Sequence, residues 1–346
     1  MTQAEPARRV AFRVDASAQI GGGHAMRCLA LAGGFADRGL HVSFFAGAGT
    51  SQAVPALARS GHATHVVAAD AGEALSQMRA AHPRGVDLLV VDHYGLGASF
   101  EQAGRDWARE ILAIEDVPNR RHAASILTDP TYGRAVGDYA DLVPSATTLL
   151  VGSDYALLRP EFARRRPAAL AARGRNAARA LVAMGNADPS DMTSHALAAL
   201  ERAAPEIAVD VLLGSGSPNV AQVRAAVARL GPSARLHLDS DAVADLMAHA
   251  DLCVGACGST AWERCALGLP TVGVVTATNQ ASIAANLERA GALLWVRAAH
   301  DEPALVAAIG ALVRDDKLRA EMSRKAARIC DANGVGRVVE AVVAKL

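Results

Sequence analysis

Two patterns of hydrophobic and polar residues alternate along almost the whole chain. Short runs of consecutive apolar residues are each bounded by glycine or a charged residue. Between them lie longer segments in which apolar residues recur every three to four positions. The short runs predict strands that are buried on both faces, and the longer segments predict amphipathic helices. Their regular alternation predicts the α/β fold class, with parallel sheets and right-handed crossovers.

The first part of the chain shows this alternation up to about residue 150. Its predicted strands are residues 10–15, 41–45, 64–67, 87–92 and 110–115, and its predicted helices are residues 24–38, 53–59 and 73–81, with Trp107 on a further helix. The pattern breaks near residues 152–176, where Arg164-Arg165-Arg166 precedes Pro167. This segment predicts an interdomain linker with a solvated arginine face, and a phosphate-binding patch is the less favoured alternative.

The alternation resumes in the second part. Its predicted strands are residues 180–184, 209–213, 234–238, 251–255, 271–275 and 293–296, and its predicted helices are residues 192–202, 220–230, 242–248 and 279–290, followed by helices to the end. We therefore expect two doubly wound Rossmann-like domains, residues 1–155 and 177–346, joined by residues 156–176. Ligands of such sheets bind at the carboxyl ends of the strands, so we expect a cleft between the domains. The last helices could pack back on the N-terminal domain.

The stretch Gly255–Pro270 is the most informative local pattern. A buried strand ends at Gly255, the turn Gly258-Ser259-Thr260 opens a helix, and Gly268 ends it. Backbone N–H groups at the positive end of a helix dipole suit a diphosphate. Glu263 lies one turn beyond Ser259 on the same face, where a carboxylate can accept hydrogen bonds from ribose hydroxyls. An ordinary βα turn is an equally weighted alternative.

Other candidate side chains also follow predicted strands. His24 begins a helix after the loop Gly21-Gly22-Gly23, which does not fit the dinucleotide-binding pattern GxGxxG. His24 is a candidate general base, and a structural histidine at a helix start is the alternative. Asp92-His93-Tyr94 closes the strongest strand, and Tyr94 could reach a ligand. The amides of Asn279-Gln280 suit hydroxyl or acetamido groups, although Asn279 is also a good N-cap.

A further polar group follows residue 115. It consists of Asp116, Asn119, Arg120, His122 and Asp129. Two carboxylates in one region suggest glycosidase-type acid and base chemistry. Because these residues lie on different loop segments, a structural role is the better interpretation for most of them.

Composition narrows the function classes. The 346 residues carry a formal net charge of 0, which gives no electrostatic reason to expect nucleic acid or an anionic membrane as partner. The 5 cysteines show no paired CxxC spacing, so we expect buried thiols in a reducing compartment and no zinc site. The polar start at residues 1–9 lacks the apolar core of a signal peptide. We expect a cytoplasmic protein without membrane insertion, and a monomer by default.

Several motifs together resemble one family. They are Arg13-Val14-Asp15-Ala16-Ser17, Gly23-His24-Ala25-Met26-Arg27-Cys28, Asp92-His93-Tyr94-Gly95-Leu96, Gly152-Ser153-Asp154-Tyr155-Ala156, and the series from Gly258-Ser259-Thr260 through Leu267-Gly268-Leu269-Pro270-Thr271 to Asn279-Gln280. In this order they resemble the PseG family of UDP-sugar hydrolases, which is related to MurG and other glycosyltransferases of the GT-B fold. Where the family usually has Gly-Gly-Ser-Thr, this chain has Cys257-Gly258-Ser259-Thr260.

The resemblance implies a GT-B fold and hydrolysis of UDP-2,4-diacetamido-2,4,6-trideoxy-β-L-altropyranose, in pseudaminic acid biosynthesis for flagellin glycosylation. Water would attack C1 with inversion, with His24 as the catalytic base. The turn 258–260 would hold the diphosphate, and Glu263 would bind ribose. The remaining implied substrate contacts are Asp15, Gly23, Tyr94, Asn279 and Gln280. No cofactor or metal is implied, because no carboxylate cluster accompanies the turn.

Three alternatives stay open. The first is a GT-B glycosyltransferase that uses a UDP-sugar donor and an acceptor hydroxyl in place of water. The second is a hydrolase of a closely related diacetamido nucleotide sugar. The third is a non-catalytic protein that binds nucleotide sugars, against which a histidine on a ligand-side loop argues weakly.

Overall fold

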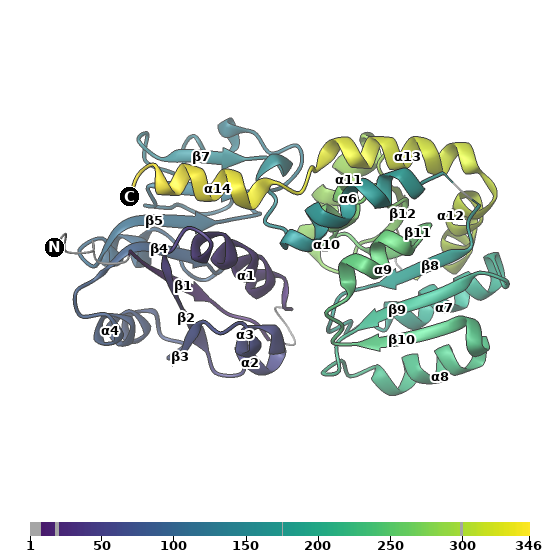
Figure 1. The fold of residues 1–346 in the computed structure, drawn as a ribbon, viewed down its shortest axis with the longest axis horizontal. Helices are drawn as coiled ribbons and strands as arrows, with labels where there is room; N and C mark the ends of the chain where they lie inside the picture. Colours follow the sequence, from purple (N-terminus) through teal and green to yellow (C-terminus); the bar gives the residue numbers. More distant parts are fainter. Residues whose placement is uncertain (1–7, 18–20, 175, 298–299) are drawn as a thin grey trace. The chain divides into compact units, whose positions relative to one another are not determined.

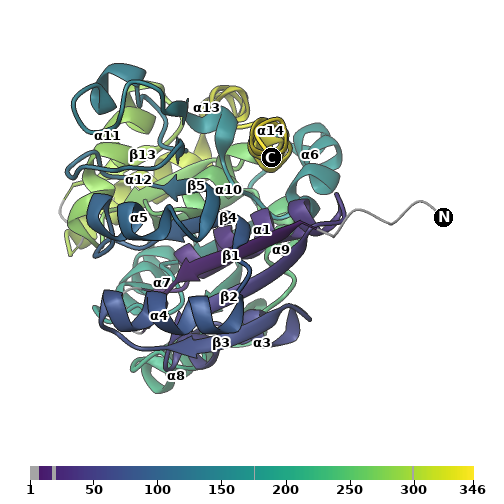
Figure 2. The ribbon, with the colours of Figure 1, turned by 90° about the vertical axis from the view of Figure 1, so that its left-hand side faces the viewer.

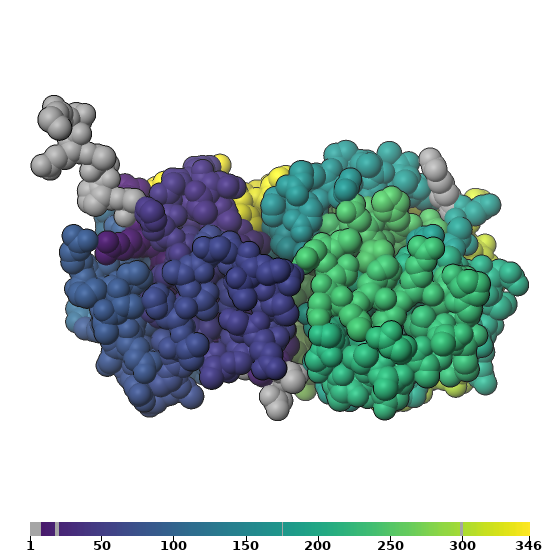
Figure 3. Space-filling model, turned by 60° about the horizontal axis from the view of Figure 1, so that its bottom comes forward, coloured from purple at the N-terminus to yellow at the C-terminus, as the bar shows by residue number. Residues whose placement is uncertain are grey.

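The computed structural model describes residues 8–17, 21–174, 176–297 and 300–346, which are drawn in colour in Figure 3. Three predicted segments therefore lie partly outside the described residues: the polar start at residues 1–9, the first loop at 16–23 and the linker at 156–176. The chain divides into two compact units. Unit 1 combines Met1–Arg159 with Asn333–Leu346, and unit 2 is Pro160–Ala332.

Unit 1 is built on a parallel sheet, which has seven strands within the described residues. In spatial order they are β3 (Ala63–Val67), β2 (His41–Gly47), β1 (Arg9–Val14), β4 (Val86–Asp92), β5 (Ala108–Ile114), β6 (Ile126–Asp129) and β7 (Thr148–Val151). The register aligns Val14 of β1 with Asp92 of β4, so the carboxyl ends of these two central strands lie side by side.

The period-two alternation of strand side chains divides the core of unit 1 between the two faces of the sheet. Val10, Phe12 and Val14 pack with α1 (Gly23–Ala36) and α3 (Pro55–Arg59). Ala11 and Phe45 pack with α4 (Ala71–Ala81) and α5 (Ala98–Gly104). The shorter elements of the unit are α2 (Thr50–Ala53), η1 (Val136–Tyr139) and η2 (Ser153–Tyr155). Helices thus cover both faces, as the continuous apolar runs predict.

The end of the chain returns to unit 1 as α14 (Gly334–Val343), which packs against α1 (Figure 1). Figure 2 looks along this helix, with the C-terminus at its near end. A side chain at Gly34 would come within 2.6 Å of Val335, so glycine allows the two helices to approach. Val338, Val339 and Val342 of α14 complete the apolar core on that face of the sheet.

Unit 2 repeats the doubly wound plan on a parallel sheet with six strands in its described part. Their order is β10 (Ala234–Leu238), β9 (Ala208–Leu213), β8 (Arg179–Ala183), β11 (Leu252–Ala256), β12 (Thr271–Val274) and β13 (Leu294–Val296). The helical elements are α6 (Pro160–Ala172), α7 (Met192–Ala203), α8 (Val220–Leu230), η3 (Gly231–Ser233), α9 (Val243–His249), α10 (Thr260–Ala266), η4 (Thr278–Gln280), α11 (Ala281–Arg289), α12 (Glu302–Arg314) and α13 (Asp316–Ile329). Within the described ranges no helix has the length and hydrophobicity that a membrane span requires.

Most of the segment predicted as a linker is helix α6, which belongs to unit 2. Arginines of the predicted linker donate hydrogen bonds to carbonyl groups at the C-terminal ends of other helices. Arg166 donates to Ala327 O at 2.7 Å and to Cys330 O at 2.9 Å, at the end of α13. Arg173 donates to Met247 O at 3.0 Å, at the end of α9. Arginines in these positions satisfy carbonyl groups that have no partner within their own helix.

The predicted elements differ from the structure at three further places. Trp107 lies in the turn before β5 rather than on a helix, and its indole N–H donates to His82 O at 2.9 Å. The predicted helix 53–59 is divided into α2 and α3, because Pro55 has no N–H with which to continue a helix. The last two strands of the sheet, β6 and the edge strand β7, were not predicted, because each has only four residues.

Candidate functional site

Each sheet has a topological switch point, where neighbouring strands lead into connections that run in opposite directions. In unit 1 it lies between β1 and β4, and in unit 2 between β8 and β11. Ligands of doubly wound sheets bind outside the carboxyl ends of the strands at this place. The predicted site residues follow these strands: Asp15 and His24 after β1, Tyr94 after β4, and Gly258-Ser259-Thr260 after β11.

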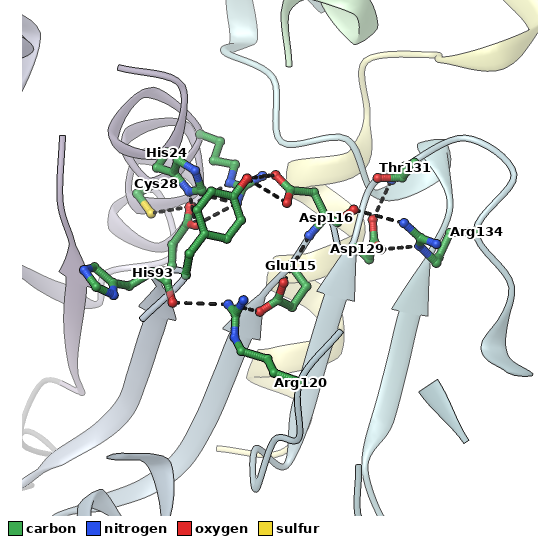
Figure 4. A network of polar contacts seen from close by, with 12 residues as sticks. His24, Cys28, His93, Glu115, Asp116, Arg120, Asp129, Thr131 and Arg134 are labelled. Atoms are coloured by element: carbon green, nitrogen blue, oxygen red, sulfur yellow. Dashed lines mark hydrogen bonds and ion pairs between the residues drawn. The ribbon is translucent and has the colours of Figure 1, made fainter. Parts of the chain in front are cut away.

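In unit 1, a buried cluster joins the start of α1 to the end of β4. His24 Nδ1 lies 2.5 Å from Asp92 Oδ1. Arg27, one turn further along α1, donates to both carboxylate oxygens of Asp92 at 2.6 Å. Leu88 and Val90 face α1, so the alternation of β4 places Asp92 on the same face. Figure 4 shows His24 and Cys28 on α1, with Asp116 beyond them.

The hydrogen bonds determine the tautomer of His24. A carboxylate only accepts hydrogen bonds, so the 2.5 Å contact with Asp92 places a proton on Nδ1. The guanidinium of Arg27, 3.1 Å from Nδ1, is a donor and cannot serve as an alternative acceptor. The other ring nitrogen, Nε2, has no hydrogen-bonding partner among the described residues. Neutral His24 therefore has a lone pair on Nε2 that can accept a proton.

The charges of this cluster compensate one another. Burial by itself raises the pKa of Asp92, but the charge of Arg27 and the contact with His24 outweigh burial and hold that pKa well below its usual range. Asp92 in turn holds the pKa of Arg27 well above its usual range, against the effect of burial. Asp92 is therefore a carboxylate and Arg27 a guanidinium at any physiological pH. Burial raises the pKa of Cys28, whose thiol contacts Asp92 at 3.4 Å, so it stays protonated.

Tyr94 lies beside His24. The two rings meet edge to face, with centroids 4.7 Å apart. The Tyr94 hydroxyl donates to both oxygens of Asp116, at 2.8 and 2.9 Å. Arg27 also contacts Asp116, at 3.2 Å, so His24 and Tyr94 belong to one network. With 41% of its surface exposed, Tyr94 is the most accessible of these four side chains.

Asp15 does not join this network. The alternation of β1 turns it to the opposite face of the sheet from Val14, together with Arg13. Asp15 accepts from Arg13 at 2.5 Å, from Gly47 N at 2.6 Å and from His93 Nε2 at 3.1 Å. Burial raises the pKa of Asp15, but the hydrogen bonds of His93 and Arg13 outweigh it and lower that pKa well below its usual range. These contacts give Asp15 a structural role at the β1–β2 edge.

The polar residues after β5 are also largely structural, as their dispersed positions suggest. His122 lies between Glu101 at 2.7 Å and Glu115 at 3.1 Å. All three are buried, and Arg120 adds a second cation to Glu115. Asp129, also buried, accepts from Arg134, Tyr139 and Thr131 N at 2.5, 2.8 and 2.9 Å. Two members of this group reach the His24 network: Asp116 contacts Arg27 and Tyr94, and the Arg120 guanidinium lies over the ring of Tyr94.

In unit 2, the turn Gly258-Ser259-Thr260 follows β11 and α10 begins at Thr260. Ser259 is exposed, while Gly258 and Thr260 are half-buried. Gly268 ends the helix in the left-handed conformation, with φ of 56°, as its place in the sequence predicts. Arg264 is buried beneath the turn and donates to Ala256 O at 2.7 Å and Thr260 Oγ1 at 3.1 Å.

The second predicted motif of unit 2 lies against this turn. A methyl group added at Gly258 would lie 3.5 Å from Gln280 Nε2, and Gln280 Oε1 accepts from Thr276 N at 2.9 Å. The predicted helix start at Asn279 is wrong by two residues, since Asn279 lies in η4 and Gln280 is the N-cap of α11. Glu263 is half-buried on α10. Gly258 and Gln280, far apart in the sequence, are thus neighbours.

The loop after β8 also has a clear role. Asp188 is buried and accepts from Met192 N at 3.0 Å and Thr193 N at 2.8 Å. These are the first N–H groups of α7, whose N-cap position is Asp191, so the Asp188 carboxylate satisfies two donors at the start of that helix. Its φ of 36° lies in the left-handed region, which aspartate tolerates better than most residues.

Sequence reasoning missed Arg27 and Arg264 as site residues. Arg27 is buried on α1 and Arg264 is buried on α10, and each of these helices is the first to follow a central strand. Their position after a strand end was the available signal that they belong to a site. A guanidinium that is buried there requires hydrogen-bond acceptors from neighbouring segments. The acceptors are the side chain of Asp92 and the carbonyl of Ala256, which only the fold brings into place.

Comparison with known proteins shows which families and proteins the chain is similar to. The model of the glycosyltransferase family 28 C-terminal domain matches residues 181–337. The chain is 26% identical over 290 residues to UDP-2,4-diacetamido-2,4,6-trideoxy-beta-L-altropyranose hydrolase of Campylobacter jejuni, covering 82% of this chain and 97% of that protein. It is 27% identical over 327 residues to the spore coat polysaccharide biosynthesis protein SpsG of Bacillus subtilis, covering 91% and 88%. To the uncharacterized protein MJ1062 of Methanocaldococcus jannaschii it is 23% identical over 270 residues, covering 76% of this chain but only 55% of that protein.

Solved structures show the same fold. MurG of Acinetobacter baumannii superimposes with a TM-score of 0.64 at 16% identity, covering 97% of this chain and 99% of that one. The glycosyltransferase of kitacinnamycin gives a TM-score of 0.69 at 15% identity, covering 99% and 100%. The chain therefore has the two-domain GT-B fold, and its second domain is similar to the C-terminal domain of glycosyltransferase family 28.

Proposed function

We propose that this protein hydrolyses UDP-2,4-diacetamido-2,4,6-trideoxy-β-L-altropyranose to UDP and the free sugar. The observation that carries the proposal is the His24–Asp92 pair, in which Nδ1 is committed to the carboxylate and Nε2 is available as a base. The relative from Campylobacter jejuni, which bears the name of this activity, supports the choice of substrate. The GT-B fold and the family 28 match support the broader class, an enzyme of nucleotide-sugar chemistry.

In the proposed reaction, His24 Nε2 removes a proton from a water molecule as its oxygen attacks C1 of the sugar. The C1–O bond breaks, and its electron pair goes to the departing phosphate oxygen of UDP, so the configuration at C1 inverts. Asp92 keeps the proton on Nδ1 and stabilises the imidazolium that forms. UDP is a good leaving group, so no strong general acid is required. Pseudaminic acid biosynthesis, as a step before flagellin glycosylation, is the setting that the proposal implies.

Binding residues complete the proposal. The backbone N–H groups of the turn 258–260 hold the diphosphate, and Glu263 binds ribose. Tyr94 and Gly23 contact the sugar, together with Asn279 and Gln280. The position of Gln280 Nε2 beside Gly258 supports a shared role for these two motifs. Arg264 supports the diphosphate assignment, because its buried positive charge has no carboxylate partner among the described residues. Asp15 is the weakest candidate, because its carboxylate is already occupied.

A GT-B glycosyltransferase is the second candidate, favoured by the family 28 match. One experiment separates the two. Purified protein is incubated with the UDP-diacetamido sugar in H₂¹⁸O without any acceptor. We expect UDP release with ¹⁸O at C1 of the sugar. Turnover that appears only after an acceptor is added would support the transferase, and binding without turnover under both conditions would support a non-catalytic role.

A further inference from the structure

The hydroxyl of Tyr94 has a fixed hydrogen-bond direction. Its proton is donated to Asp116, whose two oxygens lie 2.8 and 2.9 Å away. Arg27 contacts the same carboxylate at 3.2 Å and keeps a positive charge beside it. A carboxylate offers only acceptors, so the phenolic proton has to point toward Asp116.

The surroundings hold the tyrosine ring itself in place. It meets the ring of His24 edge to face, with the centroids 4.7 Å apart and an angle of 85° between the planes. On the ring face, the Arg120 guanidinium lies 5.7 Å from the centroid. Arg120 is in turn held by the buried Glu115 and by the carbonyl of His93, at 3.2 Å. Tyr94 is therefore exposed to ligand but supported from two sides.

These contacts determine what Tyr94 can recognise. With its proton committed to Asp116, the hydroxyl oxygen presents lone pairs to any ligand beside His24. We infer that Tyr94 accepts a hydrogen bond from an N–H group of the sugar, and so selects an N-acylamino sugar over the O-acyl sugar of the same shape. A carbonyl or ester oxygen at that place would face the tyrosine lone pairs, which is unfavourable. This inference rests on the proposed function, since it assigns one group of that substrate.

The test compares three UDP-sugars with the full-length protein. They are the diacetamido sugar and two analogues, each with an acetoxy group in place of one acetamido group. With the wild-type protein, we expect one analogue to show about a tenfold lower kcat/KM. Most of the change should be in KM, because the hydrogen bond forms in ground state and transition state alike.

Two variants assign the preference to the hydroxyl and its direction. Tyr94→Phe should hydrolyse the diacetamido sugar and that analogue with nearly equal kcat/KM. Asp116→Asn should shrink or reverse the preference, since the carbonyl of the asparagine turns to Arg27 and its N–H₂ group to Tyr94, which releases the phenolic proton toward the ligand. Tyr139→Phe is the matched control, because Tyr139 also donates to a carboxylate, Asp129, but is fully buried. It should keep the wild-type preference.

The outcomes separate this inference from the proposed function. If the wild-type protein hydrolyses all three sugars equally well, or if the preference survives in Tyr94→Phe, the inference is wrong while the hydrolase proposal stands. If the diacetamido sugar itself is not hydrolysed, the proposed function fails. In that case, competition by the free sugars against binding of the diacetamido nucleotide sugar still reports whether Tyr94 selects the N–H group.

Discussion

The two switch points carry opposite kinds of chemical groups. In unit 1, the carboxyl ends of β1 and β4 carry ionised side chains, and Asp92 lies between His24 and Arg27. In unit 2, the end of β11 carries a turn of small residues with the neutral amide of Gln280 beside it. The same fold thus provides a proton acceptor at one sheet and backbone donors at the other. In the proposed function, unit 1 accepts the proton and unit 2 holds the diphosphate.

The two switch points also differ in how their buried charges are compensated. The negative charge of Asp92 is shared by two partners within hydrogen-bonding distance. Arg264 in unit 2 is equally buried, but it bonds to a carbonyl and a hydroxyl, with no carboxylate partner in the described part of the chain. Its positive charge therefore adds to that of the helix start at the turn, and an anionic ligand would supply the missing counter-charge.

The largest effect is expected from removing the base of unit 1. His24→Ala should lower kcat for the UDP-diacetamido sugar by roughly 10²–10⁴, the usual contribution of a general base. The Kd for UDP, measured by calorimetry, should stay within about twofold, because the proposed diphosphate site belongs to unit 2. His41→Ala, which changes an exposed histidine at the start of β2, is the control. If His24→Ala kept near wild-type activity, the proposed role of His24 as general base would be wrong.

Asp92→Asn tests the support of the base. An amide has one acceptor oxygen and one NH₂ group in place of two acceptor oxygens, so its NH₂ group would face a donor of Arg27 or His24, and the buried guanidinium would lose its charged partner. We expect the free energy of unfolding to fall by about 3–5 kcal/mol and kcat to fall at least tenfold at a temperature where the variant is folded. Denaturant unfolding and steady-state kinetics measure the two changes. Unchanged kcat in the folded variant would show that the tautomer of His24 does not depend on Asp92.

The sequence predicts the sheets well because local patterns determine them. The runs at 234–238 and the helix at 220–230 match β10 and α8 to the residue. The network around His24 was less predictable, because Asp92 and Arg27 lie 65 residues apart and only the pairing of β1 with β4 brings them together. Alternation also separates Asp15 from His24, although both follow β1. A motif shows which residues lie near a strand end, but not which face each one takes.

In the predicted linker, sequence patterns failed to show even the secondary structure. Alanine and arginine favour helix in residues 160–172, but the polar composition and Pro167 hide the amphipathic pattern. Arg166 and Arg173 look solvated in sequence because their partners are backbone carbonyls, which leave no signature in side-chain composition. The prediction of an arginine-rich linker was wrong for that reason.

Unit 1 should also differ from unit 2 in its response to pH. Burial lowers the pKa of His122, but the hydrogen bonds of Glu101 and Glu115 outweigh it and raise that pKa to about 9. The unfolded value is near 6.5, so this stabilisation is complete below about pH 6.5 and is lost as pH rises through 9. The loss is on the order of 3 kcal/mol. Hydrogen exchange at pH 6 and pH 10 should therefore show weaker protection in unit 1 at the higher pH.

The control for this pH effect is His122→Gln. Glutamine does not titrate, so the variant should be less stable than wild type at pH 6 and should lose the alkaline decrease contributed by this site. An equal decrease in the variant and the wild type would assign the alkaline effect to other groups.

The smallest expected effect is a difference in stability between alanine substitutions at two glycines of unit 2. A side chain at Gly255 would come within 2.8 Å of Arg264 and 3.0 Å of Ala183 O, so Gly255→Ala should lower the free energy of unfolding by about 1–3 kcal/mol. At Gly258 the nearest atom would be Gln280 Nε2 at 3.5 Å, an ordinary contact, so Gly258→Ala should change stability by less than about 0.5 kcal/mol. Its methyl group would instead stand at the proposed diphosphate site and weaken UDP binding.

Calorimetric Kd values of the Gly258→Ala variant for UDP and for uridine test this assignment. Weaker binding of UDP alone would place the phosphates at the turn. Equal weakening of both ligands would place the nucleoside there instead.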